Sequence, residues 1–198
     1  MLVVDNDDKK GMTFKFNYDR YSKWVAASMS WLRNDPDSIT FTRIQGLGII
    51  DAELYDINKH DIDKFLDYDL SVYDHANIKS YLWVLGVYEL FRMMDQRIRE
   101  QPGIIDDNAT TTIRNAKKEF ERIRVPLAKL EKAQRFKGDF SVPKLGADDE
   151  QLAWQINENE IIRYRDLSDL AINTLNQLRL SNYKMNKLFR DEQKEKEE

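Results

Sequence analysis

The sequence predicts a mainly α protein, a bundle of five or six helices around a central buried helix at about residues 75–101. Three observations lead to this fold class. The 198 residues include only 7 Gly and 4 Pro, 41% of them are hydrophobic, and apolar residues in the longer segments recur every three or four positions. Such spacing is typical of helices with one buried face. A small β-hairpin at about 152–165 and short N-terminal strands complete the expected fold.

The N-terminal part of the chain combines alternating segments with helical ones. Residues 12–16 (MTFKF) and 39–44 (ITFTRI) alternate between apolar and polar side chains, which predicts short strands. Between them, Asp19 is placed to cap a helix over about 20–33. The Gly46-Leu47-Gly48 segment is interpreted as a turn. Two short helices are expected to follow it, over about 51–57 and 60–73.

The helix at about 75–101 has the clearest pattern in the sequence, and Pro102-Gly103 ends it. A helical projection gives it a wide apolar face, made of Trp83, Val84, Val87, Leu90, Phe91, Met94 and Ile98. Its N-terminal half is apolar nearly all round, so other helices should enclose it. Gly86 is a position at which one of them can approach closely.

The segment that follows is expected to form a helix from about 107 to 136. Its apolar seam, with spacings of three and four, consists of Ile113, Ala116, Phe120, Ile123, Leu127 and Leu130. Pro126 interrupts the seam, and a proline in a helix removes a hydrogen bond, so either one kinked helix or two nearly collinear helices are expected. Residues 137–150 are interpreted as a loop.

In the hairpin, a three-residue loop at 158–160 would set Ile156 opposite Ile162 and Trp154 opposite Tyr164. The last helix is then expected to begin at a Ser168 cap. Its seam consists of Ala171, Leu175, Leu178, Met185 and Phe189. Residues 1–190 are thus expected to form a single helical domain, and residues 191–198 a charged, frayed tail.

Composition argues against several classes of function. The chain has no cysteine, which excludes disulfides, thiolate catalysis and cysteine-based zinc sites. No glutamate precedes a histidine by three residues, which argues against the di-metal site of helical bundles. No metal site and no cofactor are expected. The N-terminus does not resemble a signal peptide, and the longest apolar uncharged run, at 80–88, is too short to cross a bilayer. A cytoplasmic protein without a membrane partner is therefore expected.

Charged residues interrupt the central apolar segment. Glu89 and Arg92 lie three residues apart, and Asp95 and Arg99 extend the series along the helix. A buried carboxylate must be paired or protonated, because an isolated buried charge is costly. The first interpretation is a structural polar network of these four residues. The alternatives are a catalytic pocket, with Glu89 as acid or base and Arg92 holding an anion, and an interface in an oligomer.

Two segments have opposite charge. Residues 51–74 contain eight acidic residues and two lysines, a net charge of −6, and residues 114–137 contain nine basic and three acidic residues, a net charge of +6. The basic segment has a stripe that could follow phosphate groups, made of Arg114, Lys118, Arg122 and Arg124. The two segments could instead face each other, within one chain or across a dimer.

The function predicted first is that of a non-catalytic helical-bundle protein that acts by binding or self-assembly, as a homodimer. Its aromatic-rich segments supply more apolar surface than one short bundle buries, and an exposed remainder would mark an interface. The first alternative is a nucleic-acid- or phosphate-binding protein that uses the basic helix 114–137. The second is an enzyme with a Glu89/Arg92 pocket. The sequence names no ligand, partner or pathway.

Overall fold

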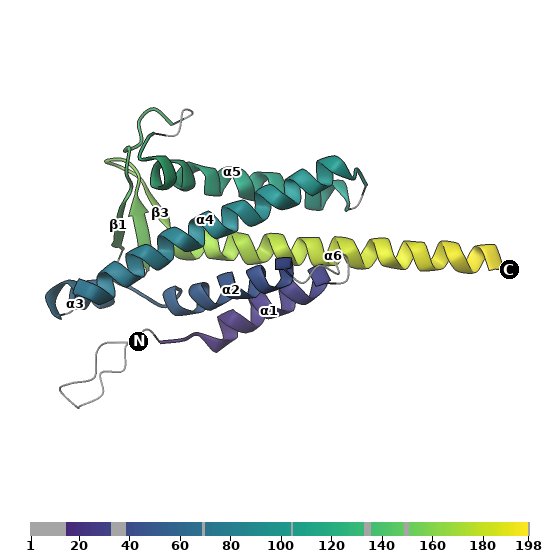
Figure 1. Ribbon diagram of the computed structural model, residues 1–198, viewed down its shortest axis with the longest axis horizontal. Helices are drawn as coiled ribbons and strands as arrows, with labels where there is room; N and C mark the ends of the chain where they lie inside the picture. Colours follow the sequence, from purple (N-terminus) through teal and green to yellow (C-terminus); the bar gives the residue numbers. More distant parts are fainter. Residues whose placement is uncertain are drawn as a thin grey trace.

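The computed structural model describes residues 15–32, 39–68, 70–103, 105–132, 136–148 and 151–197, with the side chains of 30–32, 39, 147 and 182–197 left aside. Six helices and one antiparallel sheet make up this part of the chain, which confirms the predicted mainly α fold with a small β element (Figure 1). The elements are α1 (Tyr18–Leu32), α2 (Ile39–Leu54), α3 (Lys59–Tyr68), α4 (Leu70–Glu100), α5 (Asp107–Lys129), β1 (Lys144–Ala147), β2 (Leu152–Gln155), β3 (Ile161–Arg163) and α6 (Tyr164–Glu197).

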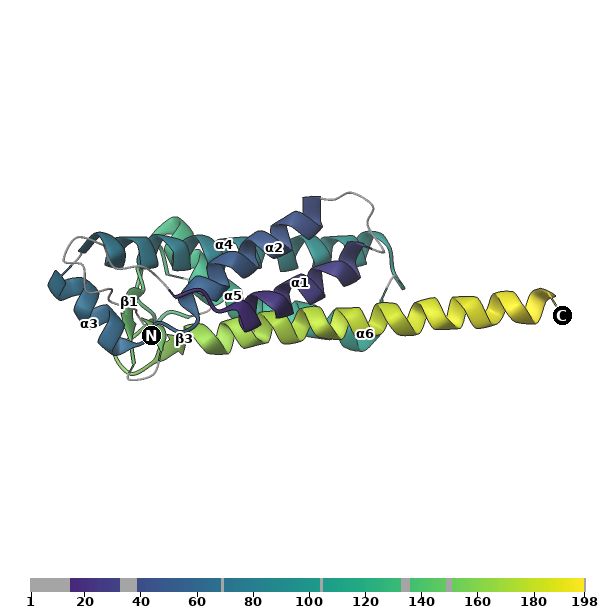
Figure 2. The ribbon, with the colours of Figure 1, turned by 90° about the horizontal axis from the view of Figure 1, so that it is seen from below.

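The two longest helices lie on opposite sides of the molecule. Figure 2 shows α4 along one side and α6 along the other, and the pair of α1 and α2 lies across the face nearest the viewer, with α2 against α4 and α1 against α6. Helix α5 packs against both α4 and α6. The sheet, in the order β1-β2-β3, lies at the end where α3 meets α4 and α6 begins. At the other end, α6 projects well beyond the other helices (Figure 1).

Aromatic side chains from four elements form the centre of the core. The Trp83 ring of α4 lies 4.7 Å from that of Tyr164, 5.6 Å from that of Phe120 and 6.5 Å from that of Trp24, measured between ring centroids. All seven residues of the predicted apolar face of α4 are buried. The same holds for the predicted seam of α5 from Ile113 to Ile123, whereas Leu130 is 66% exposed.

The enclosure of α4 is less complete than the sequence predicts. Ile78 is 53% exposed and Leu82 is 50% exposed, so one side of the N-terminal half is open to solvent. The opposite side is enclosed as expected, because Trp83, Val84 and Val87 are buried there. Helix α2 packs closely beside the open side, because a Cβ atom added at Gly86 would lie 2.5 Å from Leu47 Cδ2 of α2. The prediction that other helices of the chain surround this segment is therefore wrong on one face.

The predicted strand at 39–44, the turn at 46–48 and the short helix at 51–57 are wrong, because one helix, α2, spans Ile39–Leu54. Its buried positions have helical spacing and include Thr40, Ile44, Leu47, Gly48, Asp51 and Ala52. Six alternating residues are too few to distinguish a strand from one side of a helix. The strand expected at 12–16 lies mostly outside the described residues, and 15–17 precede α1 without strand structure.

Several helix boundaries also differ from the predictions. The α1 cap is Asn17, whose Oδ1 accepts a hydrogen bond from the Arg20 backbone N–H at 2.9 Å, and not Asp19. Helix α3 ends at Tyr68 and α4 begins at Leu70, earlier than expected. Helix α5 ends at Lys129 because Leu130 adopts a left-handed conformation (φ 55°). Pro126 therefore lies in the last turn of α5.

The C-terminal hairpin exists, but its register and length differ from the prediction. Trp154 pairs with Ile162, a shift of two residues from the predicted partner Tyr164, which instead begins α6. Part of the predicted loop forms the third strand, β1. Ser168 lies within α6 and does not cap it. In the predicted seam of α6, Ala171, Leu175 and Leu178 are buried, and the helix continues to Glu197. Fraying of residues 191–198 stays a prediction.

Candidate functional site

The structure places Glu89 and Arg92 on the outside of α4. Glu89 Oε2 accepts a hydrogen bond from Arg92 Nε at 2.6 Å, and the two side chains are 47% and 50% exposed. The hydrogen bond and the negative charge of Glu89 raise the pKa of Arg92. The two residues are thus paired with each other, as the sequence indicates, but they form a surface ion pair instead of a buried one.

Asp95, the third member of the predicted network, belongs to a separate cluster. Its buried carboxylate accepts hydrogen bonds from Lys117 Nζ and, at 3.1 Å, from Arg114 Nε, both on α5. Arg99, the predicted fourth member, lies 4.0 Å away. Burial by itself would raise the pKa of Asp95, but the hydrogen bonds from α5 outweigh it and the pKa is lowered. This cluster fastens α5 to α4.

The predicted phosphate-binding residues have partners within the chain. Arg122 donates hydrogen bonds to Asp139 at 3.0 and 3.1 Å and to Glu160 at 2.6 and 2.8 Å. The Arg124 guanidinium lies over the Tyr88 ring, 4.9 Å from its centroid. Lys118 is exposed. The carboxylates that pair with Arg114 and Arg122 all lie outside the acidic segment 51–74.

Replacing Arg122 with Met is expected to lower the free energy of unfolding at pH 7 by about 2 kcal/mol, since Asp139 is buried whereas Glu160 is half exposed. The hydrogen bonds from Arg122 lower the pKa of both carboxyl groups from their ordinary values of 3.8 and 4.5. Their stabilising contribution is therefore present above the unfolded pKa and is lost as the pH falls.

Urea denaturation between pH 7 and pH 3 would measure this effect. We expect the Arg122→Met variant to lose less stability than the unmodified protein over the acidic part of this range. Lys118→Met, an exposed position of the same helix, is the matched control and should leave the pH profile unchanged. Parallel profiles for the unmodified protein and Arg122→Met would refute the role given to Arg122.

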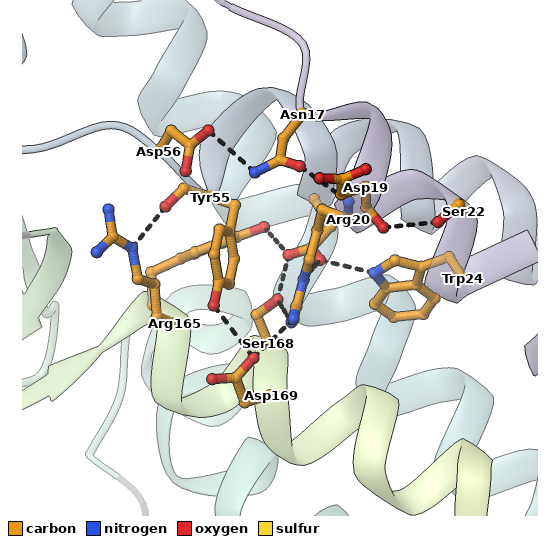
Figure 3. Close-up of polar contacts among 12 residues, drawn as sticks. Asn17, Asp19, Arg20, Ser22, Trp24, Tyr55, Asp56, Arg165, Ser168 and Asp169 are labelled. Carbon is orange, nitrogen blue, oxygen red and sulfur yellow. Dashed lines mark hydrogen bonds and ion pairs between the residues drawn. The ribbon is translucent and has the colours of Figure 1, made fainter. Parts of the chain in front are cut away.

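A second polar cluster, which the sequence does not predict, surrounds Asp51 at the junction of α1, α2 and α6. Figure 3 labels Arg20, Trp24 and Ser168 among its members. The Asp51 side chain is fully buried. Its Oδ2 atom accepts hydrogen bonds from Arg20 Nε at 2.7 Å and from Trp24 Nε1 at 2.6 Å. Its Oδ1 atom accepts hydrogen bonds from the Tyr164 hydroxyl at 2.9 Å and from the Ser168 hydroxyl at 2.5 Å. All four acceptor positions of the carboxylate are therefore occupied.

Arg20 links this buried centre to the surface. Its Nη1 donates to Asp169 Oδ1 at 2.6 Å, its Nη2 donates to the Ser168 hydroxyl, and its guanidinium lies 4.1 Å from the centre of the Tyr55 ring. Burial disfavours the charge on Arg20, but Asp51 and Asp169 outweigh burial and raise its pKa. The Arg20 guanidinium is therefore charged throughout the physiological pH range.

The sequence positions of these residues explain the geometry. Arg20 and Trp24 are four residues apart on α1, and Tyr164 and Ser168 are four residues apart on α6, so each pair projects from one face of its helix. Asp51 projects from α2 between the two pairs. Burial, followed by the negative charge of Asp51, raises the pKa of Tyr164 well above its ordinary value, so the hydroxyl keeps its proton and donates.

The Asp51 cluster holds helices together and offers no accessible reactive group. The Ser168 hydroxyl donates to Asp51 and accepts from Arg20, and it is buried, so no substrate can reach it as a nucleophile. Within the described ranges, no group of three or more His, Cys, Asp or Glu residues is arranged to hold a metal ion. In the same part of the chain, none of the helices has the length and apolar character needed to cross a membrane. The cluster fixes α1 and α2 on α6.

We compared the chain with models of protein families, with curated proteins and with solved structures, and none of the three comparisons gave a match.

Proposed function

We propose that this chain acts by self-assembly, as a homodimer, and not by catalysis. The observation that supports the proposal is the open side of α4. Ile78 and Leu82 are each about half exposed on successive turns of a helix whose opposite side forms the centre of the core, and Leu85 is partly exposed on the next turn. Single exposed apolar residues are common, but a continuous stripe on one helix is typical of an interaction surface.

The placement of the other polar residues favours this proposal over an enzyme. A catalytic acid or base is usually found in an enclosed site that perturbs its protonation. Glu89 and Arg92 are instead paired with each other on the outside of α4. The most enclosed polar cluster, around Asp51, has its hydrogen bonds satisfied within the protein.

A nucleic-acid function is the less favoured alternative for a similar reason. Arg114 and Arg122 each bind a carboxylate of the same chain, and Arg124 lies on an aromatic ring. A phosphate group would have to compete with these contacts. The exposed charge of Lys118 alone does not make the multiple phosphate contacts that nucleic-acid binding requires.

Sedimentation equilibrium tests the proposal. The chain has a mass of 23.5 kDa, and we expect a particle of twice this mass at micromolar concentration that dissociates on dilution. Adding duplex DNA or RNA at low salt is expected to leave this mass unchanged. A single-chain mass up to millimolar concentration would refute self-assembly, and a mass increase with nucleic acid that disappears at high salt would favour the alternative.

A further inference from the structure

We infer that the interface is the outer face of α4 and that two copies pack their α4 helices antiparallel about a two-fold axis near Leu82. The inference rests on the proposed function and names the surface that performs it. The outer face is defined here by Asp74, His75, Ile78, Leu82, Leu85, Glu89 and Arg92.

The spacing of these residues is that of a helix-pairing seam. From His75 to Arg92 they follow one another at intervals of three, four, three, four and three residues. This is the pattern that keeps one narrow stripe facing a partner helix. All of them are exposed except Leu85, which is partly buried. The middle of the seam is apolar and both of its ends are polar, as in an interface with an apolar core and a polar rim.

No described element covers this seam. In Figure 1, α4 crosses the side of the molecule that faces the viewer, with no other helix in front of it. Helix α2 borders it, because Lys79 binds Glu53 at 2.7 Å and Gly86 meets Leu47. Ile49 of α2, 44% exposed, lies between these two contact positions along the helix.

The polar residues at the two ends of the seam are complementary under a two-fold axis. Glu89 lies seven residues after Leu82 and His75 lies seven residues before it, so an antiparallel pair sets the Glu89 carboxylate opposite the partner's His75, whose ring N–H can donate a hydrogen bond. Arg92 lies ten residues after Leu82, and Asp74 lies eight residues before it. In the antiparallel pair, Arg92 and the partner's Asp74 are therefore offset by two residues, about 3 Å along the helix, which a long arginine side chain can span. A parallel pair would instead place each charge beside its own copy, which is unfavourable.

The intrachain pair of Glu89 and Arg92 does not oppose this arrangement. An ion pair between exposed side chains contributes little to stability, because water screens it and both side chains must be ordered. Both groups are about half exposed and can make additional contacts with a partner. Of the three interpretations of Glu89 and Arg92 in the sequence analysis, this arrangement corresponds to the last, an interface in an oligomer.

The test replaces Leu82 with Lys and measures the mass by sedimentation equilibrium. We expect the variant to have the mass of one chain and to keep the helical circular dichroism of the unmodified protein, since Leu82 is half exposed. The matched control is Leu66→Lys on α3, where the leucine is 51% exposed but lies outside the seam, and this variant should stay dimeric. A dimeric Leu82→Lys protein would overturn the assignment of the interface, while a monomeric unmodified protein would overturn the proposed function as well.

A charge exchange provides a second test that does not alter the apolar residues. Arg92→Asp is expected to weaken the dimer, and adding Asp74→Arg to the same chain is expected to restore it, because the charges are then exchanged across the two-fold axis. If the double variant dissociates as readily as the single one, the antiparallel pairing is refuted. Should Leu82→Lys fail to fold, the charge exchange decides the question alone.

Discussion

Replacing Asp51 with Ala is expected to lower the free energy of unfolding by about 3–5 kcal/mol, the usual effect of removing one partner of a buried ion pair. The variant would leave the Arg20 cation buried with Asp169 as its remaining carboxylate. The Trp24 indole N–H and the Tyr164 hydroxyl would lose their acceptor in the interior. Because a small protein is stable by only about 5–15 kcal/mol, this one substitution is expected to remove a large part of its stability.

Urea denaturation followed by tryptophan fluorescence measures this effect. The matched control is Asp63→Ala, which removes an exposed carboxylate of α3 and is expected to change stability by no more than about 0.5 kcal/mol. A double-mutant cycle between Arg20 and Asp51 should show strong coupling, since the two side chains are in contact. If Asp51→Ala costs no more than the control, the central role of the Asp51 cluster in holding three helices together is wrong.

Replacing Gly48 with Ala is the second substitution expected to have a large effect, a loss of about 1–3 kcal/mol or more from overpacking. A Cβ atom at this position would lie 2.4 Å from Trp24 Cβ and 2.7 Å from Trp24 Cγ. These atoms are close to the α1 backbone, so the conflict cannot be relieved by rotating the end of a side chain. Helices α1 and α2 would have to separate, and the hydrogen bond from Trp24 to Asp51 would be strained.

Gly46 supplies the control within the same helix. A Cβ atom at Gly46 would have no neighbour within 4 Å, so Gly46→Ala is expected to raise stability by up to about 1 kcal/mol through better helix propensity. Thermal or urea unfolding of the two variants should therefore give shifts of opposite sign. Equal losses of stability at the two glycines would indicate that this segment is the turn suggested by the sequence and not part of α2.

The sequence predicts the fold best where a helical pattern is long. The sequence predicts the apolar face of α4 and the α5 seam from Ile113 to Ile123 residue by residue, because each pattern repeats over several turns. The sequence predicts a strand at 39–44 wrongly, because six residues fit both the strand period and the helix period. The close approach at Gly86 was predicted correctly, but the similar role of Gly48 was hidden by its neighbour Gly46, since two nearby glycines resemble a turn.

The polar clusters were harder to predict than the helices. The pairing of Glu89 with Arg92 follows from their spacing, but their exposure does not, because the pattern of one helix cannot show whether its apolar side is covered by the same chain or by another copy. The sequence does not single out Asp51, because this residue begins a run of acidic residues that, taken together, resembles a solvated surface. Its donors come from α1 and α6, and only the tertiary structure brings them together.

Disulfide cross-linking tests the central claim, that two copies meet at the outer face of α4, most directly. The chain has no cysteine, so a single cysteine at position 82 can react only with its copy in a second chain. We expect Leu82→Cys to form a covalent dimer rapidly under mild oxidation, and Asn77→Cys, exposed on another side of α4, to react slowly. Cross-linking at position 82 that is no faster than at position 77, in a protein shown to be dimeric, would contradict the claim.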